Sequence, residues 1–414
     1  MNILIVSENL LYGGLETRMQ DFSSYCTARG HSVWFAVNNF DEEFNRNLGV
    51  QKVTHGIGMA FYSSANQMCR VVDKLCAIIR EHNIDLVEAH PFNSILPAVL
   101  AANAMRKPVV ITIHGAANVL ESYKDPYYHT LIYHLCLQNA DLVVATSSDL
   151  SNLLHIYTAN TSIVPNGVDT NRFKPATVSE KGPWAIVSRF DRAKTPGIMD
   201  AIEKLARASV HEIHLFGDFT QEAERNKRQI VSFCLRHKVH IVFKGHVNNL
   251  HEVLREGYSG VVAMGRALLE AVSLNIPAIL VGYLGTIGLV DYELFEAAKS
   301  ANFSARGLSV CTQEQFNNAM QQLAKTPDRY RIRDRVLSEI DSTQIWARYV
   351  SSLEHITQTA ALPKERISML HTLLKCLQDQ NQCDWSHPAF LGGVRDIIPE
   401  LSQHLALKLE VRPR

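Results

Sequence analysis

Residues 261–281 restrict the possible folds of this chain more than any other stretch. They predict the end of a short apolar strand, a turn at Gly265, a helix over about 266–274 and a second strand over 278–281. Pro277 closes the helix, because the residue before a proline is driven out of the α region. The second strand is an unbroken apolar run, which is typical of a strand covered on both faces. The stretch therefore predicts a strand–helix–strand unit of an α/β protein.

The first turn of this predicted helix is a candidate ligand site. Its N–H groups have no partner within the helix and lie at the positive end of the helix dipole. Gly265 allows a ligand to approach them closely, which suits a phosphate, and Glu270 can accept hydrogen bonds from ligand hydroxyls. Phosphate and hydroxyls together indicate a nucleotide. The alternative is an ordinary turn followed by a solvated glutamate.

Apolar strands and helical segments alternate along both halves of the chain. Strands are predicted at 2–6, 32–37, 84–89, 109–113, 142–146 and 161–164, and again at 184–188, 212–216 and 240–243. This alternation predicts parallel, doubly wound sheets.

A turn-rich polar stretch divides the two series of strands. We interpret 168–182 as a linker between an N-terminal domain over 1–167 and a C-terminal domain over 183–341. A helix follows over 342–358. The chain then continues into an extension over 363–414 that has a helical pattern and in which we find no site.

Charge and cysteine usage narrow the class of protein. The 414 residues carry a formal net charge of zero, which argues against a general nucleic-acid binder. Residues 1–170 hold 10 Lys/Arg and 15 Asp/Glu, a net charge of −5, so the remainder carries +5 and is the more favourable half for a nucleotide. Eight cysteines without a C-x-x-C pair predict reduced thiols. No apolar run approaches the roughly 20 residues of a membrane span, so we expect a cytoplasmic protein with at most peripheral contact at the inner membrane face.

Three features of the first half are predicted at strand ends, where ligands of doubly wound sheets gather. Gly13 and Gly14 follow the first strand and expose backbone N–H groups, whereas His90 and His114 each follow a later strand. His114 is the better candidate, because Gly115 behind it leaves room for a substrate. A structural role is the alternative for each histidine.

Two cations of the second half also lie at a strand exit. Arg189 can bind phosphate oxygens with two donors, and Lys194 supplies a mobile point charge. Solvated surface charges are the alternative, but Gly265 is expected at the same edge of the same sheet. We expect residues 282–288 to form a flexible, glycine-rich loop at that edge.

Five features carry a resemblance, in this order: Y-G-G-L-E at 12–16, T-I-H-G at 112–115, P-N-G-V-D with Arg172 and Phe173 at 165–173, S-R-F-x-x-x-K at 188–194, and G-H-V at 245–247 followed by G-R-A-L-L-E-A at 265–271. Each is weak alone, but their order and spacing are specific. The chain resembles the GT-B glycosyltransferases of the large retaining group called family four, over roughly residues 1–358.

The resemblance implies a fold and an activity. The fold is GT-B: two Rossmann-like, doubly wound parallel-sheet domains face each other across a cleft, and the helix at 342–358 packs back on the first. The activity is retaining transfer of a sugar from a UDP- or GDP-sugar to a hydroxyl acceptor, which is a glycan or a lipid-linked or protein-linked glycoconjugate of the cell surface. No cofactor and no metal are implied. The extension at 363–414 is a candidate surface for an oligomer or a partner protein.

The resemblance also implies residue roles. The catalytic residues are His114, Arg189 and Lys194. The donor is bound by Gly13, Gly14, Arg189, Lys194, Gly245, His246, Val247, Gly265, Arg266 and Glu270. His90 and Asn93 are expected on the acceptor side.

One position departs from the family pattern. Val262 stands where the family has a glutamate that contacts donor-sugar hydroxyls, eight residues before the position of Glu270. We expect backbone N–H groups around 263–265, together with Arg266, to meet those hydroxyls instead. The loss also favours a second hypothesis, a catalytically silent partner subunit or chaperone of an active transferase. A nucleotide-sugar epimerase or a phosphorylase is the alternative among enzymes.

Overall fold

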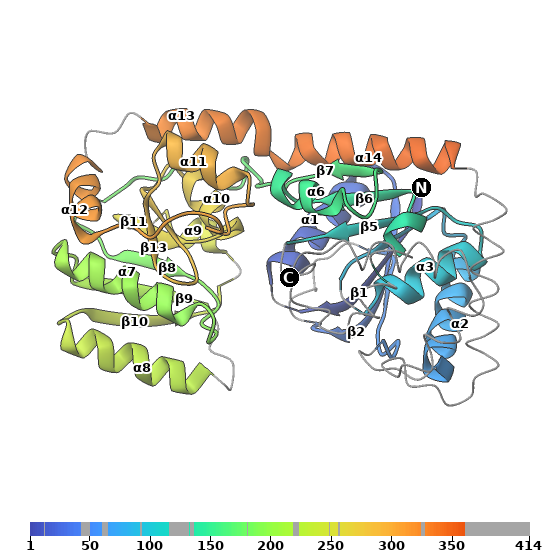
Figure 1. The fold of residues 1–414 in the computed structure, drawn as a ribbon, viewed down its shortest axis with the longest axis horizontal. Coiled ribbons are helices and arrows are strands. Elements are labelled where there is room, and N and C mark those ends of the chain that lie inside the picture. Colours follow the sequence, from blue (N-terminus) through green and yellow to red (C-terminus); the bar gives the residue numbers. More distant parts are fainter. Residues whose placement is uncertain are drawn as a thin grey trace. The chain divides into compact units, whose positions relative to one another are not determined.

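The chain consists of two compact units. The computed structural model describes residues 1–11, 13–42, 50–59, 65–91, 93–115, 132, 136–179, 181–217, 223–247, 249–255, 257–323 and 328–360. One unit is Met1–Val164 with the chain from Trp346 onward, and the other is Pro165–Ile345 (Figure 1). The stretch 168–182, which we expected to be a linker, lies within the second unit. The predicted extension at 363–414 lies outside the described residues.

The described part of the first unit contains a seven-stranded parallel sheet of order β3-β2-β1-β4-β5-β6-β7. Its strands are β1 (Asn2–Leu10), β2 (Ser32–Phe40), β3 (Lys52–Thr54), β4 (Leu86–Ala89), β5 (Val109–Ile113), β6 (Leu142–Ala145) and β7 (Thr161–Ile163). The sequence predicted β5 at its observed bounds and missed β3. It also ended β1 at residue 6, whereas pairing with β2 continues to Leu10.

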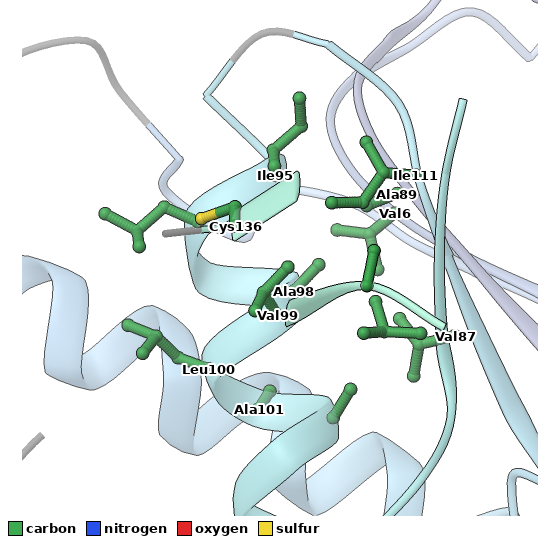
Figure 2. Packing of buried hydrophobic residues seen from close by; sticks show 14 of the residues in the cluster. Val6, Val87, Ala89, Ile95, Ala98, Val99, Leu100, Ala101, Ile111 and Cys136 are labelled. Carbon is green, nitrogen blue, oxygen red and sulfur yellow. The ribbon is translucent and has the colours of Figure 1, made fainter. Parts of the chain in front are cut away.

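Helices cover both faces of this sheet. They are α1 (Gly14–Ala28), α2 (Ala65–Glu81), α3 (Ile95–Ala104), α6 (Ser148–Leu154) and α14 (Ser342–Thr359), with a short 3-10 turn at Leu137–Asn139. Helix α3 is apolar on every side apart from Asn103, and a helix of this kind is suited to full burial. Figure 2 shows its residues Ile95, Ala98 and Val99 packed beside Val87 and Ala89 of the sheet.

Helices α1 and α14 pack against each other through aromatic side chains. The Phe22 ring lies 5.5 Å from that of Trp346 and 5.2 Å from that of Tyr349. The Arg18 guanidinium lies 4.8 Å from the centroid of the Trp346 ring. Trp346 is only 2% exposed, so this side chain of α14 is buried against α1 of the first unit.

The described part of the second unit contains a six-stranded sheet of order β10-β9-β8-β11-β12-β13. Its strands are β8 (Trp184–Val187), β9 (Glu212–Phe216), β10 (His240–Gly245), β11 (Gly260–Ala263), β12 (Ala278–Val281) and β13 (Thr286–Leu289). All pairs are parallel except β12 with β13. The prediction of a flexible loop over 282–288 was wrong in its second half, because the Gly282 N–H bonds to the Gly285 carbonyl at 2.8 Å and the chain returns as β13.

The helices of the second unit are α7 (Thr195–Arg207), α8 (Ala223–Arg236), α9 (Leu250–Val253), α10 (Arg266–Ser273), α11 (Tyr292–Lys299), α12 (Gln313–Gln322) and α13 (Asp328–Arg335), followed by a π-helical turn at Val336–Ile340. Buried residues of α7, α8 and α12 form one core with the sheet. Within the described residues, no helix combines the length and the apolar character that a membrane span needs.

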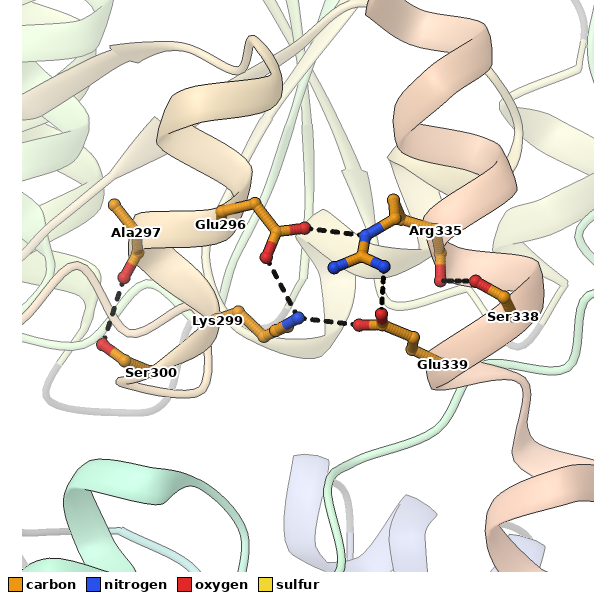
Figure 3. Close-up of polar contacts among 7 residues, drawn as sticks. All are labelled: Glu296, Ala297, Lys299, Ser300, Arg335, Ser338 and Glu339. Carbon is orange, nitrogen blue, oxygen red and sulfur yellow. Dashed lines mark hydrogen bonds and ion pairs between the residues drawn. The ribbon is translucent and has the colours of Figure 1, made fainter.

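Four charged side chains join α11 to α13 and the turn after it (Figure 3). Arg335 Nε donates to Glu296 at 2.9 Å, and Lys299 Nζ donates to Glu296 at 3.1 Å and to Glu339 at 2.7 Å. Arg335 also contacts Glu339. About a third of each side chain is exposed, so each pair contributes little to stability.

The P-N-G-V-D motif lies where the chain enters the second unit, beside the segment that leaves it. Val168 pairs with Asp341 as a parallel bridge, and Thr170 Oγ1 donates to the Asp341 carboxylate at 2.6 Å. A Cβ on Gly167 would lie 2.7 Å from Ser342 Cα, so only glycine permits this approach. The motif thus has a structural role that the sequence did not indicate.

Candidate functional site

The carboxyl ends of the strands in the second unit bring the predicted donor-binding segments to one edge. Arg189 follows β8, Gly245 ends β10 and Gly265 follows β11. Because these strands are parallel, their carboxyl ends share an edge of the sheet. Backbone hydrogen bonds from Ser188 to Phe216 at 3.0 Å and from Gly217 to Gly245 at 2.9 Å join the ends of β8, β9 and β10.

Arg189 and Lys194 lie on the loop that leads from β8 into α7. Arg189 is 59% exposed, and its Nε donates to Asp191 Oδ2 at 3.0 Å. The other oxygen of Asp191 accepts from the Lys194 backbone N–H at 3.0 Å, which orders the loop. Burial, followed by the nearby charge of Arg189, lowers the pKa of Lys194. A bound anion would stabilise the charged form of Lys194 beside Arg189.

The segment Gly245–Val247 leaves the same edge. Gly245 has a positive φ of 67°, a conformation that favours glycine, and a Cβ there would meet no described atom within 4 Å. His246 is exposed and Val247 is half-buried. The segment therefore has space for a ligand beside it.

The glycine turn before α10 differs from our expectation. Gly265 has φ 59° and is the N-cap of α10. Its N–H, which we expected to meet sugar hydroxyls, donates to the Phe303 carbonyl at 2.7 Å. The turn is thus anchored to the segment after α11, and this N–H is occupied within the protein.

Glu270 and Arg266 form an ion pair on one face of α10. Arg266 Nε donates to Glu270 Oε1 at 3.0 Å, and each side chain is 12% exposed. The structure also explains the unusual Val262: it is an interior residue of β11, fully buried in the core of the unit. The Val262 side chain therefore packs in the core of the unit.

The first unit brings two predicted histidines together at its own strand edge. His90 follows β4 and His114 follows β5, and His90 Nδ1 lies 2.8 Å from His114 Nε2. His90 is 2% exposed, whereas His114 is half-buried. His90 therefore lies behind His114, and not at the surface where we expected it to meet an acceptor. Asn93 is likewise buried, with 4% exposure.

A third buried group, Glu88, was missed by the sequence analysis. Glu88 Oε1 accepts hydrogen bonds from Thr112 Oγ1 at 2.8 Å and from Tyr349 OH at 2.9 Å. The same oxygen lies 3.5 Å from His90 Nε2. An available signal was the single ionisable residue within the apolar strand Leu86–Ala89, since a buried carboxylate needs partners. The partner Tyr349, however, lies 261 residues further along the chain.

Burial sets the protonation of the two histidines. It lowers the pKa of His90 to about 3, with a further contribution from the Arg18 cation. The pKa of His114 is also well below its usual range, because of burial and then the neighbouring His90. Both rings are therefore neutral near pH 7, so each carries one ring proton.

The predicted glycine pair takes a different position from the histidines. The backbone N–H of His90 donates to the Val6 carbonyl at 2.9 Å, so the strand edge that carries His90 lies at the level of Val6 in β1. Strand β1 continues beyond it to Leu10 before Gly13 and Gly14 begin α1. The Gly13 carbonyl accepts from Thr17, as the N-cap of that helix.

Comparison with known proteins supports the family resemblance over part of the chain and the fold over most of it. Residues 12–172 match the sequence model of Glycosyltransferase Family 4. A glycosyltransferase from Rickettsia africae ESF-5 has a TM-score of 0.68 at 14% identity, covering 87% of this chain and 99% of that one. None of the curated protein sequences compared with the chain matches it.

Two further solved structures are similar over a comparable length. Sucrose-phosphate synthase from Thermosynechococcus elongatus has a TM-score of 0.65 at 16% identity, covering 87% of this chain and 100% of that one. Anabaena HepE in complex with UDP and glucose has a TM-score of 0.64 at 16% identity, covering 86% and 100%. The predicted GT-B fold is therefore confirmed, and so is the resemblance to family four.

Proposed function

We propose that this chain is a retaining glycosyltransferase that moves a sugar from a UDP- or GDP-sugar to a hydroxyl acceptor in the synthesis of a surface glycan or glycoconjugate. The observation that carries the proposal is the shared strand edge of the second unit, where Arg189, Lys194 and the glycine turn before Glu270 are gathered. The match of residues 12–172 to family four supports it. HepE, with the same fold, binds UDP and glucose.

The proposed reaction breaks the bond between the anomeric carbon and the diphosphate oxygen. A bond to the acceptor oxygen forms on the same face of the sugar, and the acceptor proton passes to the leaving diphosphate. Negative charge grows on that diphosphate, so Arg189, Lys194 and the first turn of α10 are assigned to stabilise it. His114 is assigned to the donor sugar and Glu270 to the ribose hydroxyls. The proposal requires no metal.

A screen of UDP- and GDP-sugars for release of free nucleotide tests this proposal. The full chain is incubated with each donor, with and without simple hydroxyl acceptors. We expect one donor to be consumed, and we expect UDP or GDP to raise the melting temperature. Absence of both nucleotide binding and release would contradict the proposal.

A silent GT-B partner subunit is the second candidate, and two contacts favour it. The Gly265 N–H donates to Phe303, and the Glu270 carboxylate is paired with Arg266, so two donor-side groups are occupied within the protein. This candidate predicts that the protein releases nucleotide from no donor, whichever acceptor is supplied.

A further inference from the structure

The part of the second unit that contains α8 and β10 carries an unbalanced positive charge. Residues 223–246 hold six Lys/Arg and one acidic residue, Glu224, a net charge of +5. The chain as a whole has a net charge of zero, so this excess is local. Helix α8 lies beside α7 and next to β10, the edge strand of the described sheet (Figure 1). A local excess of this size attracts anions to this side of the unit.

The arginines of α8 lie on the side of the helix that faces away from the core. Ile230 and Cys234 are at most 1% exposed and pack with the sheet. At about 3.6 residues per turn, five exposed positions point away from Ile230. These positions, which we call the basic face, are Arg225, Arg228, Ser232, Leu235 and Arg236.

The arginines of the basic face are not neutralised by carboxylates of the described residues. Arg225 and Arg228 take part in no ion pair there, and the guanidinium carbon of Arg236 lies 5.8 Å from the centroid of the Phe233 ring. Glu224 pairs with Lys227 instead, at 3.9 Å. Because Arg225 and Arg228 are three residues apart, they are neighbours on the helix surface, where like charges repel each other. A bound anionic surface would remove that repulsion.

An apolar side chain stands among these cations. Leu235 is 74% exposed, although Cys234 beside it in the chain is buried. Leu235 follows Arg228 by seven residues, or about two helical turns, so both lie on the same side of α8. Cations next to an exposed leucine match the boundary of a bilayer, where anionic headgroups cover an apolar layer. A soluble polyanion would use only the cations.

We propose that the basic face of α8 docks on the anionic headgroups of a membrane surface, with Leu235 entering the headgroup region. The helix has 14 residues, so its side chains extend along about 21 Å and meet several headgroups at once. The opposite side of α8 stays packed on the unit, so the contact is peripheral. Lipid binding needs neither donor nor acceptor, and the inference therefore does not rest on the proposed function.

Sedimentation of the full chain with lipid vesicles tests the inference. One set of vesicles contains phosphatidylcholine and phosphatidylserine, and the other contains phosphatidylcholine alone. We expect binding to the first set only, with release in about 1 M salt, where the Debye length falls to about 3 Å. Absence of binding to the phosphatidylserine vesicles at low salt, or equal binding to both sets, would overturn the proposal.

A triple variant then locates the contact on α8. It combines Arg225→Gln, Arg228→Gln and Arg236→Gln. Each basic residue near an anionic membrane contributes about fivefold in affinity, so binding should weaken by about 10²-fold. The melting temperature should change little, because arginine and glutamine have similar helix propensities.

A second triple variant is the charge-matched control. It removes three exposed arginines of the first unit, by Arg29→Gln, Arg70→Gln and Arg106→Gln. We expect it to bind the vesicles within about twofold of the unaltered chain at physiological salt, where charges farther than about 8 Å from the lipid are screened. Equal losses in the two triple variants would show that net charge, and not the basic face, is responsible, and would overturn the proposal.

Leu235→Gln tests the apolar part of the contact. We expect weaker binding at every salt concentration with an unchanged salt dependence, because the charges are unaltered. Unchanged binding would contradict the entry of Leu235 into the headgroup region, and with it the proposal.

Heparin, a soluble polyanion, separates the remaining class of partner. If the chain binds heparin through the three arginines but does not bind phosphatidylserine vesicles, the basic face is a site for an acidic macromolecule and the proposal is wrong. A chain that docks on vesicles as expected but neither binds nor releases nucleotide would contradict the proposed function and leave this inference intact.

Discussion

The polar side chains at the strand edge of the first unit are buried, whereas those at the strand edge of the second unit are exposed or half-buried. In the first unit, Glu88 and His90 are 1% and 2% exposed, and Glu88 accepts hydrogen bonds from the buried side chains of Thr112 and Tyr349. In the second, Arg189 is 59% exposed and Lys194 half-buried. A buried network is ordered before any ligand arrives, whereas exposed cations gain most of their stabilisation from the ligand itself. We therefore expect the two edges to respond to different perturbations.

The largest effect should come from the exposed edge, and only on activity. If the proposed function holds, Lys194→Ala should lower kcat about 10²- to 10³-fold, or about 2.7–4 kcal/mol, because it removes one charge that meets the diphosphate. The melting temperature should change little. Arg192→Ala, an exposed arginine of the same loop, is the control and should retain activity. Equal losses in both variants would show that the loop as a whole, and not Lys194, is responsible.

The next effect should come from the buried edge, and it concerns stability. Tyr349→Phe removes the hydroxyl that donates to Glu88 at 2.9 Å. We expect a loss of about 1.5–3 kcal/mol in the free energy of unfolding, as for hydrogen bonds to charged groups. Hydrogen exchange of the β4 and β5 amides measures it within the first unit. Tyr330→Phe, 65% exposed, should be neutral, and a neutral Tyr349→Phe would break the comparison.

Acid should weaken the first unit through its neutral histidines. His90 has a pKa of about 3 in the folded state against 6.5 ordinarily, and the pKa of His114 is also lowered. Below pH 6.5, His90 therefore binds a proton in the unfolded chain but stays unprotonated in the folded chain. Each histidine then costs about 1.4 kcal/mol of stability per pH unit as the pH falls toward the folded-state pKa.

Hydrogen exchange of the same amides at pH 7 and pH 5.5 checks this slope. His90→Gln should be less sensitive to acid than the unaltered protein, and His155→Gln should match the unaltered protein. Equal slopes in all three proteins would mean that His90 is not held neutral by the fold.

The smallest effect should come from the ion pairs between α11 and α13. Glu296→Gln removes contacts to Lys299 and Arg335, but all these side chains are about one-third exposed. We expect a loss below about 1 kcal/mol that shrinks further at high salt, because exposed pairs are screened. Urea unfolding at low and high salt measures it. A loss as large as that in Tyr349→Phe would show that exposure does not separate the two kinds of network.

Sequence periodicity was most successful where a strand is an unbroken apolar run. Strands β5 and β12 have their predicted bounds, because a strand buried on both faces leaves a continuous hydrophobic signal. It failed at β13, whose glycine-rich sequence predicts a flexible loop and whose pairing partner makes it a strand.

The residues alone determined the α/β class, the order of elements and the chemical character of each strand exit. These follow from local propensity and periodicity, which act over a few residues. Only the tertiary structure decided that His90 lies behind His114, that Glu270 pairs with Arg266 and that Tyr349 reaches Glu88 across 261 positions. Such contacts depend on how helices pack on a sheet, and no short stretch of sequence contains that information.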